Sequence, residues 1–217
     1  MGKLFHLSRQ HLWALLLILL FSDMALIVST FSWFDESDSL TNSLKTGSLP
    51  FRVELREDFN APGSVDPGQQ VGKVVNAANT GDIPGFVRLL VMVEIVSENG
   101  VLLEAVPGDT YTFDGLNVTG TPGDGKMWAD GGDGYFYYLG LLNPGQTTAQ
   151  PLFTSVTLAP DLGPEYNNAT MKIGIKLEAS EAVRAKYRDG WWRNGDNPPA
   201  SPAALIPIDN TLKDLAI

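Results

Sequence analysis

The strongest hydrophobic feature of the chain is an apolar run close to its beginning. Leu12–Phe21 is continuously apolar, and Met24–Val28 resumes the run after Asp23. Lys3 and Arg9 precede the run, and small residues follow it. A positive start, an apolar middle and a small-residue end are typical of a secretory signal peptide. We therefore expect an N-terminal apolar signal helix.

Two fates are open for this segment. Cleavage after Ser32 fits the small-x-small form of Thr30-Phe31-Ser32 and would make Trp33 the new amino terminus. Retention as an anchor needs about 20 apolar residues, and Asp23 would then enter the bilayer at a cost of about 2.5–3.5 kcal/mol. The pattern favours cleavage at Ser32 and Trp33, so we expect membrane contact only before processing.

Beyond residue 50, short apolar or alternating segments are separated by turn residues. Phe86–Val96 is nearly continuous in apolar character, which predicts a strand in the middle of a sheet, with Val101–Val106 as its hairpin partner. Glu181–Tyr187 is the one helical turn that we expect. The segments that predict strands are Phe51–Arg56, Val71–Asn79, Phe86–Val96, Val101–Val106, Tyr135–Gly140, Pro151–Leu158 and Thr170–Glu178. Many short strands and few helices predict an all-β fold with a β-sandwich.

The pattern divides the chain into four parts. Residues 33–48 are either the first strand of the chain's own sandwich or a strand for a neighbouring molecule. Within the main domain, residues 107–133 are dense in turn residues and are expected to be irregular, and Trp191-Trp192 is expected to cover an edge of the core. The four parts are a signal peptide (1–32), an N-terminal segment (33–48), a β-sandwich domain (49–192) and a Pro-rich tail (193–217).

Composition excludes several classes of chemistry. The formal net charge is −10, which disfavours nucleic acid and anionic lipid as partners. The chain has no cysteine, and its two histidines, His6 and His11, both lie in the predicted signal peptide. The remaining chain could not carry a Ser-His-Asp triad, a thiol nucleophile or a His-ligated zinc ion. We expect no cofactor and no enzymatic activity.

One Gly-rich, aromatic region is a possible ligand-binding loop. Its carboxylates Asp124, Asp130 and Asp133 could hold Ca²⁺, but Asp-Gly is also the ordinary composition of turns. Its aromatic side chains could stack on sugars. However, side chains alternate between the two faces of a strand, so those on one face would point into the core. The candidate ligand residues are Trp128, Asp130, Asp133, Tyr135 and Tyr137.

Several short motifs follow one another along the chain in a definite order. Trp33-Phe34 followed by acids, and Thr41-Asn42 ahead of Gly47, begin the series just after the signal. It continues with Pro67-Gly68-Gln69, Val74-Val75-Asn76 and Asn79–Arg88, and then with Trp128, Asp133–Tyr138, Leu142–Thr148 and Pro151–Val156. In this order and spacing the chain resembles the TasA/camelysin family over Phe31–Trp192.

The resemblance implies a jelly-roll-like β-sandwich and a secreted subunit of biofilm-matrix or cell-surface fibres. It implies processing by a SipW-type signal peptidase, head-to-tail self-association by donor-strand exchange, and a possible accessory matrix protein. Carried onto this sequence, the donor strand includes Trp33, Phe34, Leu40 and Leu44. The metalloprotease activity attributed to camelysin-type relatives is not carried over, because no histidine follows Ser32.

Three hypotheses of function follow. The favoured one is a fibre-forming structural subunit assembled by strand donation. The second is a monomeric cell-surface adhesin or carbohydrate-binding module that uses the loops of residues 107–134. The third is an extracellular hydrolase that uses only carboxylates, such as Glu54, Glu57 and Asp58.

Overall fold

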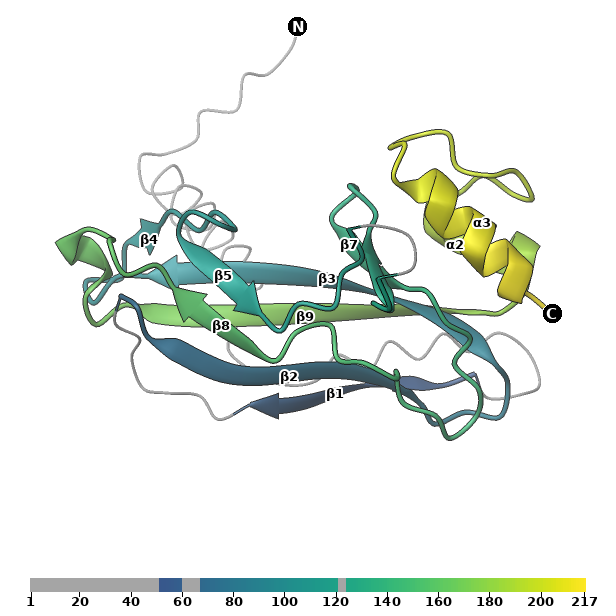
Figure 1. Ribbon diagram of the computed structural model, residues 1–217, viewed down its shortest axis with the longest axis horizontal. Coiled ribbons are helices and arrows are strands. Elements are labelled where there is room, and N and C mark those ends of the chain that lie inside the picture. Colours follow the sequence, from purple (N-terminus) through teal and green to yellow (C-terminus); the bar gives the residue numbers. More distant parts are fainter. Residues whose placement is uncertain (1–50, 60–66, 121–123) are drawn as a thin grey trace, which may run out of the picture. The chain divides into compact units, whose positions relative to one another are not determined.

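The computed structural model describes residues 51–59, 67–120 and 124–217. The predicted signal peptide, its cleavage site at Ser32 and Trp33, and the donor-strand residues up to Leu44 lie outside these ranges. The elements of the described part are the strands β1 (Val53–Phe59), β2 (Gln70–Asn79), β3 (Gly85–Val96), β4 (Leu102–Leu103), β5 (Tyr111–Asp114), β6 (Trp128–Asp130), β7 (Tyr135–Tyr138), β8 (Ser155–Leu158) and β9 (Thr170–Glu181), the 3₁₀ helix η1 (Pro164–Tyr166), and the helices α2 (Arg184–Trp192) and α3 (Leu205–Leu215) (Figure 1).

The strands form two antiparallel sheets. One has the order β1-β2-β8-β5, and the other has the order β4-β3-β7-β6 with β9 paired along β3. The predicted all-β class is thus confirmed, since antiparallel strands make up most of the regular structure and the two α-helices are short.

Apolar side chains from both sheets share one core. On β2, alternate residues such as Val71 and Val75 are buried, as expected of a strand with one face toward a core. The core residues contributed by strands are Val53, Val71, Val75, Ala77, Val87, Leu89, Ile95, Tyr111, Trp128, Tyr138, Val156, Leu158 and Leu177. The largest of them, Trp128, is fully buried, and its indole N–H donates to the carbonyl of Gln150 at 3.0 Å.

Strand β3 is the centre of its sheet, as its apolar run predicted. It pairs with β9 over its whole length and with β4 and β7 on its other side. The run is continuous because both faces of β3 are covered: Val87 and Leu89 face the main core, whereas Phe86 enters a second core on the opposite face. A strand buried on both faces loses the alternation of a half-exposed strand.

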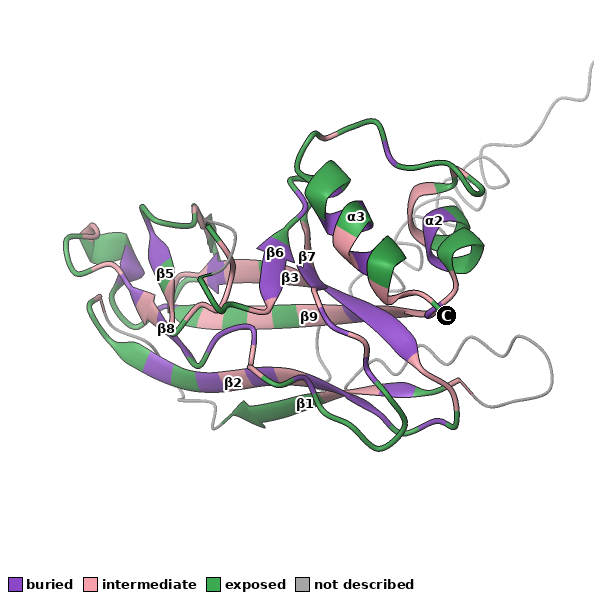
Figure 2. Ribbon diagram, turned by 45° about the vertical axis from the view of Figure 1, so that its right-hand side comes forward, coloured by how far each residue is buried: buried purple, intermediate pink, exposed green. Residues whose placement is uncertain are grey.

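The second core is formed by the C-terminal helices on the outer face of this sheet (Figure 2). Leu205, Ile208 and Leu212 of α3 are almost completely buried against Phe86 and Tyr137. Their spacing of three and four residues places them on one face of a helix. The Pro-rich composition of the tail predicted no helix, but the proline inside α3 stands in its first turn, where helices tolerate it.

Two regions differ from the sequence expectation. The span 107–133 contains the short strands β5 and β6. They were not expected, because turn residues on either side of them dominate the sequence pattern. Val101–Val106 forms a strand only at Leu102–Leu103, and Leu102 is 68% exposed.

The helical turn expected at Glu181–Tyr187 is the helix α2, which begins at Arg184 and extends to Trp192. Within the described ranges, neither helix is long and apolar enough to cross a membrane.

Candidate functional site

The outer side of β9 carries unpaired main-chain groups in the described part of the chain. The N–H of Ala182 donates to the carbonyl of Pro84, whereas Gly85 exchanges main-chain hydrogen bonds with Leu142 on the other side of β3. Hydrogen-bonded pairs alternate along an antiparallel ladder, so the even residues of β9 bond to β3. The N–H and C=O groups that point away from β3 therefore belong to Ile173, Ile175, Leu177 and Ala179, and no described strand pairs with them.

The side chains of these residues make this edge suitable for another strand. Leu177 is buried in the main core, and Ile173, Ile175 and Ala179 pack partly against it. A strand added here would continue both the hydrogen-bond ladder and the apolar layer. Strand β1 is the corresponding edge of the other sheet, but its last four residues are exposed and three of them are charged. Charged, hydrated edges of this kind resist strand addition.

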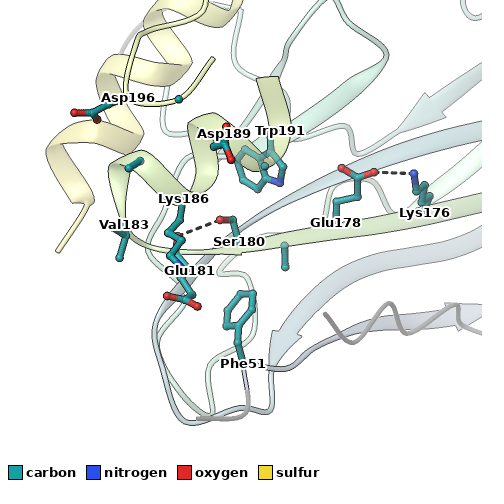
Figure 3. Close-up of a pocket in the computed structure, with 14 residues that line it drawn as sticks. Phe51, Lys176, Glu178, Ser180, Glu181, Val183, Lys186, Asp189, Trp191 and Asp196 are labelled. Carbon is teal, nitrogen blue, oxygen red and sulfur yellow. Dashed lines mark hydrogen bonds and ion pairs between the residues drawn. The ribbon is translucent and has the colours of Figure 1, made fainter. Parts of the chain in front are cut away.

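An open groove of about 830 Å³ follows the C-terminal half of this edge. Residues from Lys176 to Glu181 of β9 form its floor, α2 forms one wall, and Phe51 closes the other side. In Figure 3, Phe51 lies on one side of β9 and Trp191 on the other. The two rings belong to different layers, because Phe51 packs on the main core and Trp191 on the second core.

Phe51 is held in this position by a glycine. Its ring lies against Gly85, the first residue of β3, so closely that a Cβ at Gly85 would overlap it. The same imagined Cβ would lie 2.8 Å from the carbonyl oxygen of Ser180 on β9. Phe51, the first described residue, therefore lies at the C-terminal end of β9.

A buried charge network fixes the wall formed by α2. The guanidinium of Arg88 donates to Glu178 at 2.6 and 2.9 Å and to the Tyr137 hydroxyl at 2.9 Å. The Tyr137 hydroxyl also donates to Asp133 at 2.6 Å and accepts from the Trp192 indole at 3.0 Å. The central atom of the guanidinium lies 3.8 Å from the centre of the Tyr135 ring.

Burial and charge act in opposite directions on this network. Burial raises the pKa of Glu178. Hydrogen bonds from Lys176 and Arg88 and the charge of Arg88 lower this pKa, and together they outweigh burial, so the pKa lies below its usual value. Burial and the hydrogen bond to Asp133 raise the pKa of Tyr137, which keeps its hydroxyl neutral. The network thus consists of charged carboxylates, a cation and neutral phenols, and it anchors α2 beside the groove.

The Glu178→Gln variant should lose stability at neutral pH and become less sensitive to acid. Because the folded-state pKa of Glu178 is lowered, its contribution is present above the unfolded value of about 4.3 and disappears as pH falls through the folded value. Losing hydrogen bonds to a charged partner costs about 1.5–3 kcal/mol. Urea unfolding between pH 7 and pH 3 measures this, and equal acid sensitivity of wild type and variant would contradict it. Glu98→Gln, at an exposed carboxylate in the β3–β4 turn, is the control.

The residues predicted as a ligand loop have structural roles. Trp128 and Tyr137 are both 0% exposed, so neither presents a ring face to a sugar. Asp130 accepts from the N–H of Gly132 at 2.8 Å, and Asp133 accepts from the N–H of Tyr135 at 3.1 Å, as turn residues do. Tyr135 donates from its hydroxyl to Glu178 at 2.9 Å. The structure brings Asp133, Tyr135 and Tyr137 together around Arg88 and places Trp128 in the other core.

The carboxylates considered for calcium do not lie in a described metal-binding group. Within the described ranges no group of three or more metal-ligating side chains occurs. Glu57 forms an ion pair with the buried Lys73 at 2.6 Å, and Asp124 accepts from the N–H groups of Gly120 and Lys126.

Sequence reasoning missed Arg88 and Glu178, and it expected Trp191 only to cover an edge of the core. Arg88 carried a usable signal, because it is the only charge within the apolar stretch Phe86–Val93. A cation at the centre of a buried strand requires a carboxylate partner. The partner, Glu178, is 90 residues further along the chain, and no local pattern identifies it.

Comparison with family models, with curated proteins and with solved structures gave no match.

Proposed function

We propose that this chain is a secreted structural subunit, with a jelly-roll-like β-sandwich, that polymerises into extracellular matrix or cell-surface fibres. Polymerisation is by donor-strand exchange after a SipW-type signal peptidase cleaves between Ser32 and Trp33. The donor is residues 33–48, with Trp33, Phe34, Leu40 and Leu44 as its apolar side chains. The acceptor is the outer edge of β9 on the next subunit.

The observation that carries the proposal is the outward row of main-chain groups on β9. Four residues from Ile173 to Ala179 offer N–H and C=O groups on a strand whose inner side chains already belong to the core. An added strand satisfies these groups and covers the apolar side chains beneath them. Because donor and acceptor are different surfaces of one chain, the contact repeats head to tail and produces a filament rather than a closed dimer.

The alternative of a monomeric adhesin or carbohydrate-binding module lacks a comparable observation. It relied on Trp128 and Tyr137, whose rings are fully buried. The role proposed here needs no catalytic group and no cofactor.

The proposal predicts that the chain processed after Ser32 forms filaments whose amount rises with protein concentration, visible by negative-stain microscopy. The Ala179→Pro variant should remain folded but form none, because proline removes one outward N–H without breaking the β3 ladder. Ala179→Val adds similar bulk and keeps the N–H, so it is the matched control and should still polymerise. Circular dichroism verifies folding of all three proteins.

Persistent monomers of the processed wild-type chain at high concentration would contradict the proposed function. Filaments formed equally by Ala179→Pro and Ala179→Val would contradict β9 as the acceptor edge.

A further inference from the structure

We propose that the groove beside the C-terminal half of β9 binds the amino terminus of a second copy of this chain, created by cleavage, in an antiparallel orientation. In this arrangement Trp33 contacts Trp191, Phe34 contacts Phe51, and the new α-ammonium group lies among the groove's carboxylates. The inference rests on the proposed function and specifies which end of the donor occupies which part of the acceptor.

The aromatic content of the groove matches the first two residues of the donor. Phe51 and Trp191 stand on opposite faces of β9, one on each core. Successive residues of a strand point to opposite faces, so adjacent aromatic residues on an added strand would reach one ring each. Trp33 and Phe34 are the only aromatic residues in the segment 33–48.

Trp191 is already part of an aromatic cluster that can be extended. Its ring centre lies 5.6 Å from that of Tyr137 and 6.0 Å from that of Tyr187, and the Arg88 guanidinium lies 5.2 Å from it. Aromatic pairs are favourable at such separations. Trp191 is only partly buried and lines the groove, so its remaining surface is available to another ring.

The charges of the groove match the charges of the donor. Glu181 and Asp189 line it, and neither forms an ion pair within the described residues. They suit the α-ammonium group of Trp33. In an antiparallel donor Asp35 lies two residues beyond Trp33 toward the start of β9, on the same face as Trp33, where Lys176 lines the groove.

This charge arrangement links binding to cleavage. Before cleavage Trp33 has no ammonium group, because its nitrogen forms the peptide bond to Ser32, and the chain before Ser32 is the apolar run. After cleavage the positive charge and the free end appear together. The groove would therefore recognise the processed terminus and exclude the precursor.

The position of Phe51 sets the direction. A donor segment of the same chain would end next to Phe51, at the C-terminal end of β9, so it would have to run parallel to that strand along its edge. The donor of a second copy has no such constraint. All paired strands of the described structure are antiparallel, and antiparallel pairing is slightly more stable per residue. An antiparallel donor places its amino terminus in the groove.

Engineered disulfides test this arrangement directly, because the chain has no cysteine of its own. Processed Asp35→Cys protein is mixed with processed Lys176→Cys protein of different isotope label, and filaments are oxidised and analysed by mass spectrometry. The expected result is a cross-link between residues 35 and 176 of different copies. Thr46→Cys in place of Asp35→Cys is the matched control, since only a parallel donor brings residue 46 to the groove.

A second measurement tests the ammonium group. Acetylating the amino terminus of the processed chain removes its charge and leaves every side chain intact. Filament growth should slow by about tenfold or more, which is the effect of losing a charge-assisted hydrogen bond. Growth at an unchanged rate would overturn this part of the inference.

The outcomes separate the inference from the proposed function. Filaments with the 35–176 cross-link support both. Filaments that give the 46–176 cross-link, or no cross-link in the groove, overturn the inference and leave the proposed function standing. Absence of filaments from the cysteine-free processed chain overturns both.

Discussion

The Asp209→Ala variant should lose about 3–5 kcal/mol of unfolding free energy, because among the described residues it leaves the buried guanidinium of Arg188 with only the exposed Asp196 as an ionic partner, at 3.8 Å. Arg188 donates to both carboxylate oxygens of Asp209, at 2.8 and 2.7 Å, and the Tyr187 hydroxyl donates to the same carboxylate at 2.9 Å. The two side chains are 6% and 2% exposed. Hydrogen bonding to Asp209 raises the pKa of Arg188, which stays charged in the variant.

The loss should be concentrated in the C-terminal helices. Asp209 lies on α3 and Arg188 on α2, so their ion pair holds the two helices over Phe86 and Tyr137. Chemical denaturation measures the total effect, and hydrogen exchange should show α3 losing protection before the β strands do.

A matched control separates the effect of burial from that of charge. Arg184 and Asp196 form an exposed ion pair at 3.0 Å, with side chains 51% and 62% exposed. Arg184→Ala should cost less than about 1 kcal/mol, because exposed ion pairs contribute little. Equal losses in Asp209→Ala and Arg184→Ala would refute the assignment of the Arg188–Asp209 pair as the main attachment of α3.

Deleting Trp33–Ser39 from the processed chain should abolish filaments while leaving a folded monomer. The deletion removes both donor aromatics and the first acids, and it shortens the strand available to β9 by seven residues. The deletion touches no residue of the described cores, because the first of these residues in the chain is Phe51. Negative-stain microscopy and analytical ultracentrifugation measure the assembly, and thermal unfolding of the domain should be unchanged.

The appropriate control keeps the length of the segment. Replacing Trp33–Ser39 by seven Ser and Gly residues retains the main-chain groups of a donor strand but removes its side chains. Assembly of this variant should therefore be weaker than that of the unmodified processed chain. Filaments from the deletion variant would be incompatible with strand donation by this segment.

Part of the fold could be predicted from local pattern. Alternation identified β9, and the apolar run identified β3 as the central strand, because burial on one or two faces leaves a pattern that is visible along the chain. The short strands β5 and β6 could not be found in this way. Three or four residues contain too few periods, and their turn-forming neighbours dominate the pattern.

The candidate site was less predictable than the fold. The aromatic residues Tyr135 and Tyr137 were recognised as important, but alternation indicated only that one face of them would be buried. Both faces of β7 are buried, because α2 and α3 cover the side that would otherwise face solvent. The helices occupy that side through Leu205, Ile208 and Leu212, in a segment whose prolines suggested a tail.

By itself the sequence determined that β-strands dominate, that β3 is central, and that the chain after Ser32 has neither the histidine nor the cysteine of the usual catalytic sites. These properties depend on residue type and on spacing over a few residues. Only the tertiary structure decided that no described strand pairs with the outer side of β9, that Arg88 meets Glu178, and that Phe51 and Trp191 border one groove. Each of these depends on the pairing of segments far apart in the chain, which is set by the shape of the whole core and not by any local pattern.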